Sequence, residues 1–175
     1  VVFFCSNHAH TEANSVVLIL AYQIFCMNRS AKVAYKPFMS CEPPITSFRD
    51  AAFCLNTCPL TVLDCACALR RVADMNHFDM KTFDLARYEY LSKLQHGDVS
   101  WIIPGKFIAF SGPLAKRRQL SDGVTSMTPA EYIPLFKGLG VTCVIRFNNK
   151  CYDRTVFTSA GIHHADLFYE DGGNP

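Results

Sequence analysis

Apolar runs separated by polar turns predict one strand and three helices in the first part of the chain, over residues 1–5, 11–28, 30–35 and 59–74. The longest apolar run, from Val16 to Met27, is interrupted by Gln23 and predicts a buried helix. It is shorter than the roughly 20 apolar residues that a bilayer-spanning helix needs. Pro59 suits the first turn of the third helix, where the N–H that proline lacks would have no partner.

A further helix is predicted over residues 84–96. Four of its apolar residues recur at intervals of three, which predicts one buried stripe made of Leu85, Tyr88, Leu91 and Leu94. Gly97 follows directly, and glycine is favoured where a helix ends in the left-handed conformation. We expect this helix to join two half-units.

The second half-unit begins with a predicted strand over residues 107–110 and a long polar loop over residues 114–127, a candidate binding loop. The clearest local signal follows. Thr128, Pro129 and Glu131 have the spacing of an N-cap, a first-turn proline and a capping box, and Gly140 ends the predicted helix.

A strand–helix–strand pattern then covers residues 141–147, 153–160 and 162–169. Short connections of this kind predict two parallel strands joined by a right-handed crossover, so the fold class is α/β. In open sheets of this class, chemistry takes place just beyond the carboxyl ends of the strands. Asp171 stands at that place.

Both ends of the sequence are expected to be cuts through a longer fold. The chain opens on an apolar, strand-like run without an initiator methionine. It stops shortly after the predicted strand over residues 162–169. Natural termini are usually polar and loose, so we expect a segment of a larger protein.

Composition excludes several classes. The 175 residues are 50% hydrophobic and 18% charged, which is incompatible with a disordered tail. The net charge is only +2, and the densest basic run is Lys116, Arg117 and Arg118. Nucleic-acid binding usually requires a broader basic surface, so we expect neither a nucleic-acid nor a membrane partner.

The nine cysteines indicate a reducing compartment. Their odd number, and their position within apolar runs, predict buried free thiols rather than disulfides. The pairs Cys54/Cys58 and Cys65/Cys67 suggest a zinc site at first sight. However, side chains two positions apart on a helix point away from each other, so core packing is the favoured interpretation of Cys65 and Cys67.

Six strings of residues are unusual, and they cover residues 48–51, 59–65, 101–113, 144–148, 157–161 and 166–172. Together they closely resemble one known family, the cell-division-cycle fourteen phosphatases, and the likeness extends over essentially all 175 residues. The resemblance implies tandem dual-specificity-phosphatase-like domains with mainly parallel central sheets. It divides the chain into an inactive domain without its N-terminal part, a linker helix, and the first half of a catalytic domain: residues 1–80, 81–100 and 101–175.

The family removes phosphate from phosphoserine or phosphothreonine followed by proline, and from phosphotyrosine, through a cysteinyl-phosphate intermediate. Its His-Cys-x5-Arg loop would lie beyond Pro175, so this chain alone should be inactive. Only Cys65 has an arginine, Arg71, six positions later. Both lie within a predicted helix whose amides are already bonded to carbonyls, whereas a phosphate cradle needs free amides. No metal or organic cofactor is implied.

The resemblance assigns three site residues. Asp171 matches the family's general acid. Without the resemblance, the simpler interpretation of Asp171 and the glycine after it is a turn. Glu89 and Asp98 match two acidic positions that bind a basic residue of the substrate. Alternatively, Glu89 pairs with Lys93 on a solvated helix face and Asp98 is a turn residue. The family has glutamate where this chain has Ser92 and commonly at the position of Gln95.

The resemblance also implies cell-cycle phosphoprotein substrates with Ser-Pro motifs. It implies a place in the nucleus or cytoplasm, at the spindle, centrosome or cilium, with cytoskeletal or ciliary partners. The residues do not select an oligomeric state. A second hypothesis is a non-catalytic phosphatase-derived scaffold in a cytoskeletal or signalling assembly, because the chain is incomplete as an enzyme.

Overall fold

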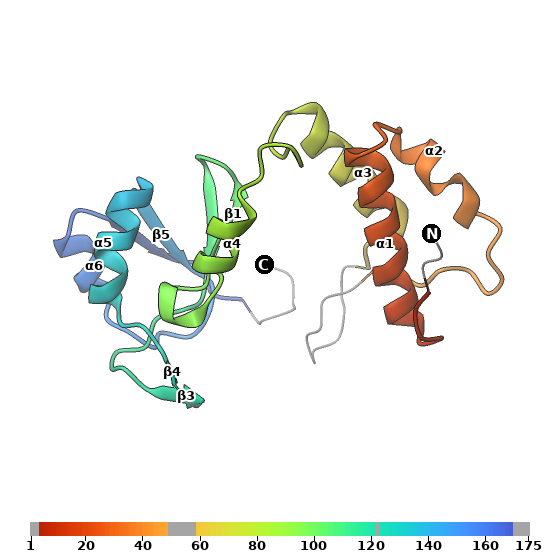
Figure 1. Cartoon of the computed structure of the whole chain (residues 1–175). Coiled ribbons are helices and arrows are strands. Elements are labelled where there is room, and N and C mark those ends of the chain that lie inside the picture. The colour runs from red at the N-terminus through yellow and green to blue at the C-terminus, as the bar shows by residue number, and fades with distance from the viewer. Residues whose placement is uncertain (1–3, 49–58, 122, 170–175) are drawn as a thin grey trace. The chain divides into compact units, whose positions relative to one another are not determined.

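The computed structural model describes residues 4–48, 59–121 and 123–169. They fall into two compact units, which divide between Phe83 and Asp84 (Figure 1). Phe4 and Cys5 are not in a strand, so the described part of the predicted strand over residues 1–5 is wrong. The rest of that strand lies outside the described residues, as do Cys54, Cys58 and Asp171.

The described part of the first unit is mainly helical. Its elements are α1 (Ala9–Phe25), α2 (Ala31–Tyr35), the 3₁₀ helix η1 (Lys36–Phe38) and α3 (Val62–Asp74). The predicted helices are therefore confirmed, with one correction at α3. This helix begins after Thr61 rather than at Pro59, because the Asp64 carboxylate accepts from the Thr61 amide at 2.9 Å in a capping box.

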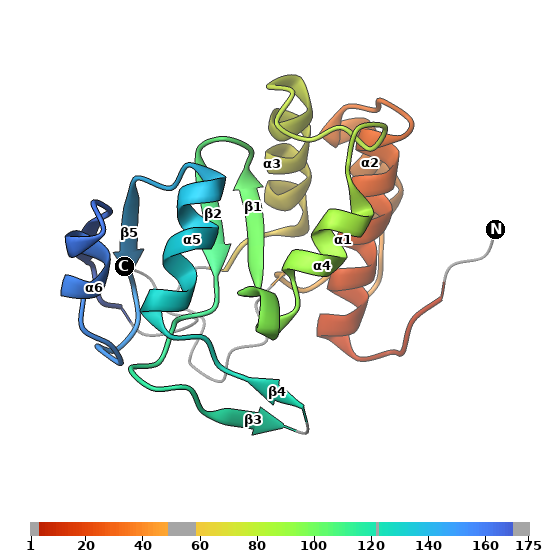
Figure 2. The ribbon, with the colours of Figure 1, turned by 60° about the vertical axis from the view of Figure 1, so that its left-hand side comes forward.

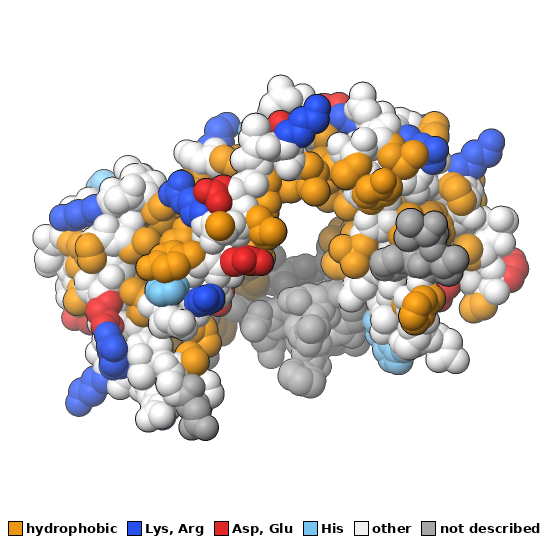
Figure 3. Space-filling view, viewed as in Figure 1, with side chains coloured by type: hydrophobic (Ala, Val, Ile, Leu, Met, Phe, Trp, Pro, Cys, Tyr) orange, Lys and Arg blue, Asp and Glu red, His pale blue; other side chains and the backbone are white. Residues whose placement is uncertain are grey.

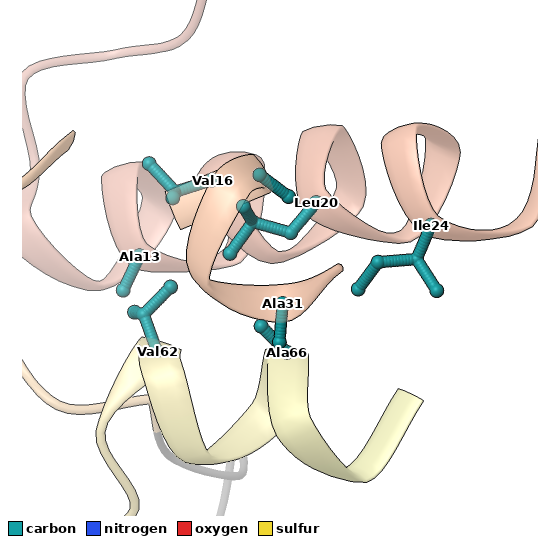
Figure 4. Packing of buried hydrophobic residues seen from close by; sticks show 8 residues of the cluster. Ala13, Val16, Leu20, Ile24, Ala31, Val62 and Ala66 are labelled. Atoms are coloured by element: carbon teal, nitrogen blue, oxygen red, sulfur yellow. The ribbon is translucent and has the colours of Figure 1, made fainter. Parts of the chain in front are cut away.

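The core of the first unit lies where α1, α2 and α3 meet. Val16, Leu20 and Ile24 recur along one face of α1, and Figure 4 shows them beside Val62 and Ala66. Leu20 and Ala66 are both 0% exposed. Ala31 and Ala34 of α2 and Ala66 of α3 belong to the same buried cluster as Leu20, and their small side chains let the helices approach closely.

The second unit combines helices with three two-stranded sheets (Figure 2). Its helices are α4 (Leu85–Leu91), η2 (Leu94–His96), α5 (Pro129–Leu139) and α6 (Thr155–Ser159). Its strands are β1 (Val99–Ile103), β2 (Phe107–Phe110), β3 (Gln119–Ser121), β4 (Val124–Thr125), β5 (Cys143–Arg146) and β6 (His163–Asp166).

The mixed α/β class is confirmed, and so is the parallel pairing of the strand–helix–strand unit, as β5 and β6. The resemblance implied mainly parallel sheets, but parallel pairing among the described strands is confined to this pair. The β1–β2 and β3–β4 pairs are antiparallel because short turns join their strands. The hairpin β3–β4 lies within the predicted polar loop over residues 114–127.

Aromatic side chains form the core of the second unit. Tyr132 and Phe136 of α5 are buried, and Phe110 of β2 lies edge-on to both, with ring centroids 5.3 and 5.0 Å away. Phe157 of α6 stacks on Phe136. The predicted start of α5 is confirmed, because the Glu131 carboxylate accepts from the Thr128 amide at 2.8 Å.

The helix predicted over residues 84–96 is shorter in the structure. It ends at Leu91, because Lys93 is extended with ψ of 138°, and a 3₁₀ turn precedes Gly97. The prediction of one buried stripe is wrong: Leu91 is 9% exposed, whereas Leu85 is 57% exposed. A helix of this length presents only part of such a stripe to the core.

The cysteines also differ from expectation. None of the seven described thiols is buried; Cys41 and Cys65 are half-buried and the others are exposed. In β5, Val144 and Arg146 point inward, so the alternation of a strand places Cys143 on the outer face. The described residues contain no group of histidine, cysteine or carboxylate side chains that could hold a metal ion. They also include no helix that is long and apolar enough to span a membrane.

The surface in Figure 3 carries basic and acidic side chains interspersed with apolar ones. Several large apolar residues on α1 are exposed, among them Leu18 and Tyr22, at 63% and 62%. Exposed apolar residues are common on folded proteins, so their exposure alone indicates no partner.

Replacement of Leu20 by alanine is expected to lower the free energy of unfolding of the first unit by about 3 kcal/mol, through lost burial and an unfilled cavity. Leu18→Ala on the exposed face of the same helix is the matched control, expected to change it by less than about 0.5 kcal/mol. Hydrogen exchange of α1 and α3 amides measures the change in the free energy of unfolding for each variant. Equal effects of the two variants would contradict the assigned core.

Candidate functional site

The carboxyl edge of β5 and β6 holds an ion pair between a buried arginine and a half-buried aspartate. Arg146 is the last residue of β5, Asp166 is the last of β6, and the two are paired in register. The Arg146 side chain is 3% exposed. Its Nε donates to Asp166 Oδ1 at 2.7 Å, and a second guanidinium nitrogen donates to the Tyr152 carbonyl at 2.7 Å.

Tyr152 and His164 complete what we call the Arg146 cluster: Arg146, Asp166, Tyr152 and His164. The guanidinium carbon of Arg146 lies 4.4 Å from the centroid of the Tyr152 ring. The Tyr152 hydroxyl is 2.9 Å from Nε2 of His164. The hydrogen bond from Arg146 holds the pKa of Asp166 below its usual range, so the carboxylate stays charged at neutral pH.

A second feature is the turn that leads from η2 into β1. Gly97 is left-handed, with φ of +104°, and an added Cβ would approach Leu135 Cδ2 to 3.0 Å. The Tyr132 hydroxyl lies 2.8 Å from the Gly97 carbonyl oxygen and 2.9 Å from that of Ser111, so it can donate to either. Burial, and secondarily the charge of Asp98, raise the pKa of Tyr132, which keeps its proton.

The two predicted recognition carboxylates both belong to this unit. Glu89 lies on α4 and is exposed. No ion pair joins it to Lys93 within the described part of the chain, because the helix ends before Lys93. Asp98 is half-buried and left-handed, with φ of +47°, and its amide donates to the Lys93 carbonyl at 3.0 Å. The turn predicted for Asp98 is therefore present, and its role in recognition stays a prediction.

The third predicted site residue, Asp171, lies outside the described residues, and its role as an acid also stays a prediction. In the sequence it follows Asp166 by five positions. Asp166 is held by Arg146, and the Leu167 amide donates to the Arg146 carbonyl at 3.0 Å. The Arg146 cluster thus fixes the strand end from which the chain leads to Asp171.

Cys65 has no features of a nucleophile. It lies inside α3, where its amide already donates to the Thr61 carbonyl at 3.1 Å. Burial, and then the neighbouring charge of Asp64, raise the pKa of its thiol above the ordinary value. Both effects oppose a thiolate that attacks phosphorus.

Comparison with known proteins gives one consistent result. The family described as the N-terminal half of dual specificity protein phosphatases matches residues 1–72. The mouse dual specificity protein phosphatase CDC14A is 40% identical over the whole chain, and human CDC14C is 36% identical over the whole chain. The CDC14 homologue of Schizosaccharomyces pombe, a tyrosine-protein phosphatase by name, is 28% identical. This chain belongs to the CDC14 family of dual-specificity phosphatases.

The chain covers 29%, 39% and 33% of the lengths of these three CDC14 relatives. The sequence strings that carry the resemblance include Arg146, yet sequence reasoning assigned it no role. One signal was available: a lone arginine at an inward position of an apolar strand requires a buried partner. That Asp166 provides it, twenty positions later, follows only from the parallel register.

Substitution of Arg146 by methionine is expected to lower the free energy of unfolding of the second unit by about 3 kcal/mol. The Asp166 carboxylate and the Tyr152 carbonyl would both lose their buried donor. Fluorescence of Trp101, the chain's single tryptophan, reports this unit during urea unfolding. Arg154→Met at an exposed position nearby is the control. A loss no larger than the control's would refute the importance of the pair.

Proposed function

We propose that this chain is part of a CDC14-type phosphatase that removes phosphate from phosphoserine or phosphothreonine followed by proline, and from phosphotyrosine, in cell-cycle signalling. The main support for this proposal is the similarity to CDC14 phosphatases over the whole length of the chain. The parallel β5–β6 pair supports it, because Asp171 follows the end of β6 by five positions in the sequence and open sheets of this class place their chemistry just beyond the carboxyl ends of their strands.

In the proposed reaction, a cysteine thiolate of the longer protein attacks phosphorus and the bond from phosphorus to the serine oxygen breaks. Asp171 gives its proton to that oxygen, which leaves as the serine hydroxyl. The Asp171 carboxylate then takes a proton from the water that attacks the phosphocysteine, and free phosphate leaves. The nucleophile belongs to the His-Cys-x5-Arg loop that the resemblance assigns beyond Pro175.

For recognition, we propose that Glu89 and Asp98 attract a basic residue downstream of the phosphoserine-proline pair. The exposure of Glu89 and the fixed backbone of Asp98 support this role. Pairs of exposed opposite charges contribute about 1 kcal/mol or less each. Because Ser92 and Gln95 are uncharged, the preference for basic residues should be weaker than in relatives with four carboxylates.

The 175-residue chain, expressed alone, is expected not to hydrolyse p-nitrophenyl phosphate. It has one Cys-x5-Arg pair, Cys65 and Arg71, and Cys65 lies within α3. Phosphate release above the background of a Cys65→Ser chain, surviving repeated purification, would contradict this expectation.

In the native protein, Asp171→Asn is expected to reduce kcat on a phosphoserine-proline peptide by about 10²- to 10⁴-fold. Hydrolysis of p-nitrophenyl phosphate should fall much less, because nitrophenolate leaves without a proton. Asp153→Asn, at an exposed position, is the control. Equal losses of activity on both substrates would show that Asp171 is not the general acid. No activity on either substrate in the unmodified native protein would favour the scaffold hypothesis.

A further inference from the structure

His164 is a buried imidazole with one ring nitrogen unpaired. Its side chain is 0% exposed. Nε2 is hydrogen-bonded to the Tyr152 hydroxyl, while Nδ1 has no hydrogen-bond partner among the described residues. The nearest carboxylate oxygen, Oδ1 of Asp166, is 3.9 Å from Nδ1, too far for a hydrogen bond.

Each element packed around this ring contributes a charged or aromatic group. Arg146 comes from β5 and Asp166 from β6 itself, and Arg154 is the N-cap residue of α6. The connection after β5 carries Lys150, which is 4.0 Å from Asp166, together with Tyr152 and Asp153. Asp153 is engaged elsewhere, since it accepts from the Thr155 amide at 2.9 Å. The Phe157 ring stacks on the imidazole with centroids 6.1 Å apart.

A proton on His164 would have no good partner in this arrangement. The one carboxylate beside it, Asp166, already accepts from Arg146 on the same oxygen. An imidazolium would have to compete with a guanidinium for that oxygen while buried against Phe157. A buried charge without a hydrogen-bonded partner is strongly unfavourable.

We propose that His164 is a proton-sensitive lock on the carboxyl edge of β5 and β6. With His164 neutral, the Arg146 cluster is closed, and the chain after β6 is held to the end of β5 and the residue after it by the amides of Leu167 and Tyr169, which donate to the carbonyls of Arg146 and Phe147. The ring nitrogen that carries no hydrogen takes up one proton from solvent, and the resulting cation leaves the core to reach water. Its exit breaks the bond to Tyr152 and then the bond from the Leu167 amide to the Arg146 carbonyl.

The direction of the effect follows from linkage. Burial first, and then the charges of Arg146 and Arg154, lower the pKa of His164 from 6.5, while Asp166 opposes them. Between the lowered pKa and 6.5 the unfolded chain binds more protons than the folded one, so stability falls as the pH falls. Each pH unit in this window changes the unfolding equilibrium about tenfold. The pKa of Asp166 lies below 3.8, so its loss belongs to a more acidic window.

The test is the pH dependence of urea unfolding of the full chain between pH 7 and 5, followed by Trp101 fluorescence. The unmodified chain should lose stability on acidification. His164→Gln should remove most of that loss, and His163→Gln, at the exposed neighbouring position, should retain it. A loss that is unchanged in His164→Gln would overturn the lock.

Proton NMR titration of the unmodified chain decides the question if His164→Gln does not fold. The His164 ring should titrate below 6.5, and protection of the Leu167 amide should fall in the same pH range. Amides of β1 and β2 should keep their protection, because this hairpin contains no member of the cluster. The proposal would be overturned if the His164 ring titrated at or above pH 6.5. It would also be overturned if the amides of β1 and β2 lost their protection from exchange together with the Leu167 amide.

Discussion

The ion pair between the buried Arg146 and the half-buried Asp166 is the constraint on which the second unit depends. A guanidinium group that is 3% exposed is stable only when its N–H groups are hydrogen-bonded. Those of Arg146 donate to the Asp166 carboxylate and to the Tyr152 carbonyl. The pair fixes the register of β5 against β6 and holds the connection between β5 and α6 over the strand ends. Arg146, Lys150 and any proton on His164 therefore all lie against the same carboxylate, that of Asp166.

How far the sequence predicts the structure depends on how local the signals are. The capping box at Thr128, helix α5, and the parallel strands β5 and β6 could all be predicted, because caps, glycines and β-branched runs act within a few residues. The helix over residues 84–96 was overestimated, because its apolar spacing continues past the point where Lys93 leaves the helix. Strand β1 was missed altogether.

The candidate site divides in the same way. The positions of Glu89 and Asp98 came from the resemblance, and the structure places one on an exposed helix face and the other in a left-handed turn. Arg146, Tyr152 and His164 could not be assigned in advance, because their contacts bridge up to twenty residues and arise only in the folded register. The cysteines were predicted to be buried because they lie in apolar runs, but strand alternation turns Cys143 outward.

The proposed function needs a thiolate from a segment after Pro175, to work with the proposed acid Asp171 and the proposed recognition residues Glu89 and Asp98. Peptide mass mapping of the native protein, directed at the region after Pro175, tests this most directly. We expect peptides that continue from Asp171-Gly172-Gly173-Asn174-Pro175 into a His-Cys-x5-Arg sequence. A native protein that ends near Pro175 would contradict the catalytic account and leave a phosphatase-derived scaffold in its place.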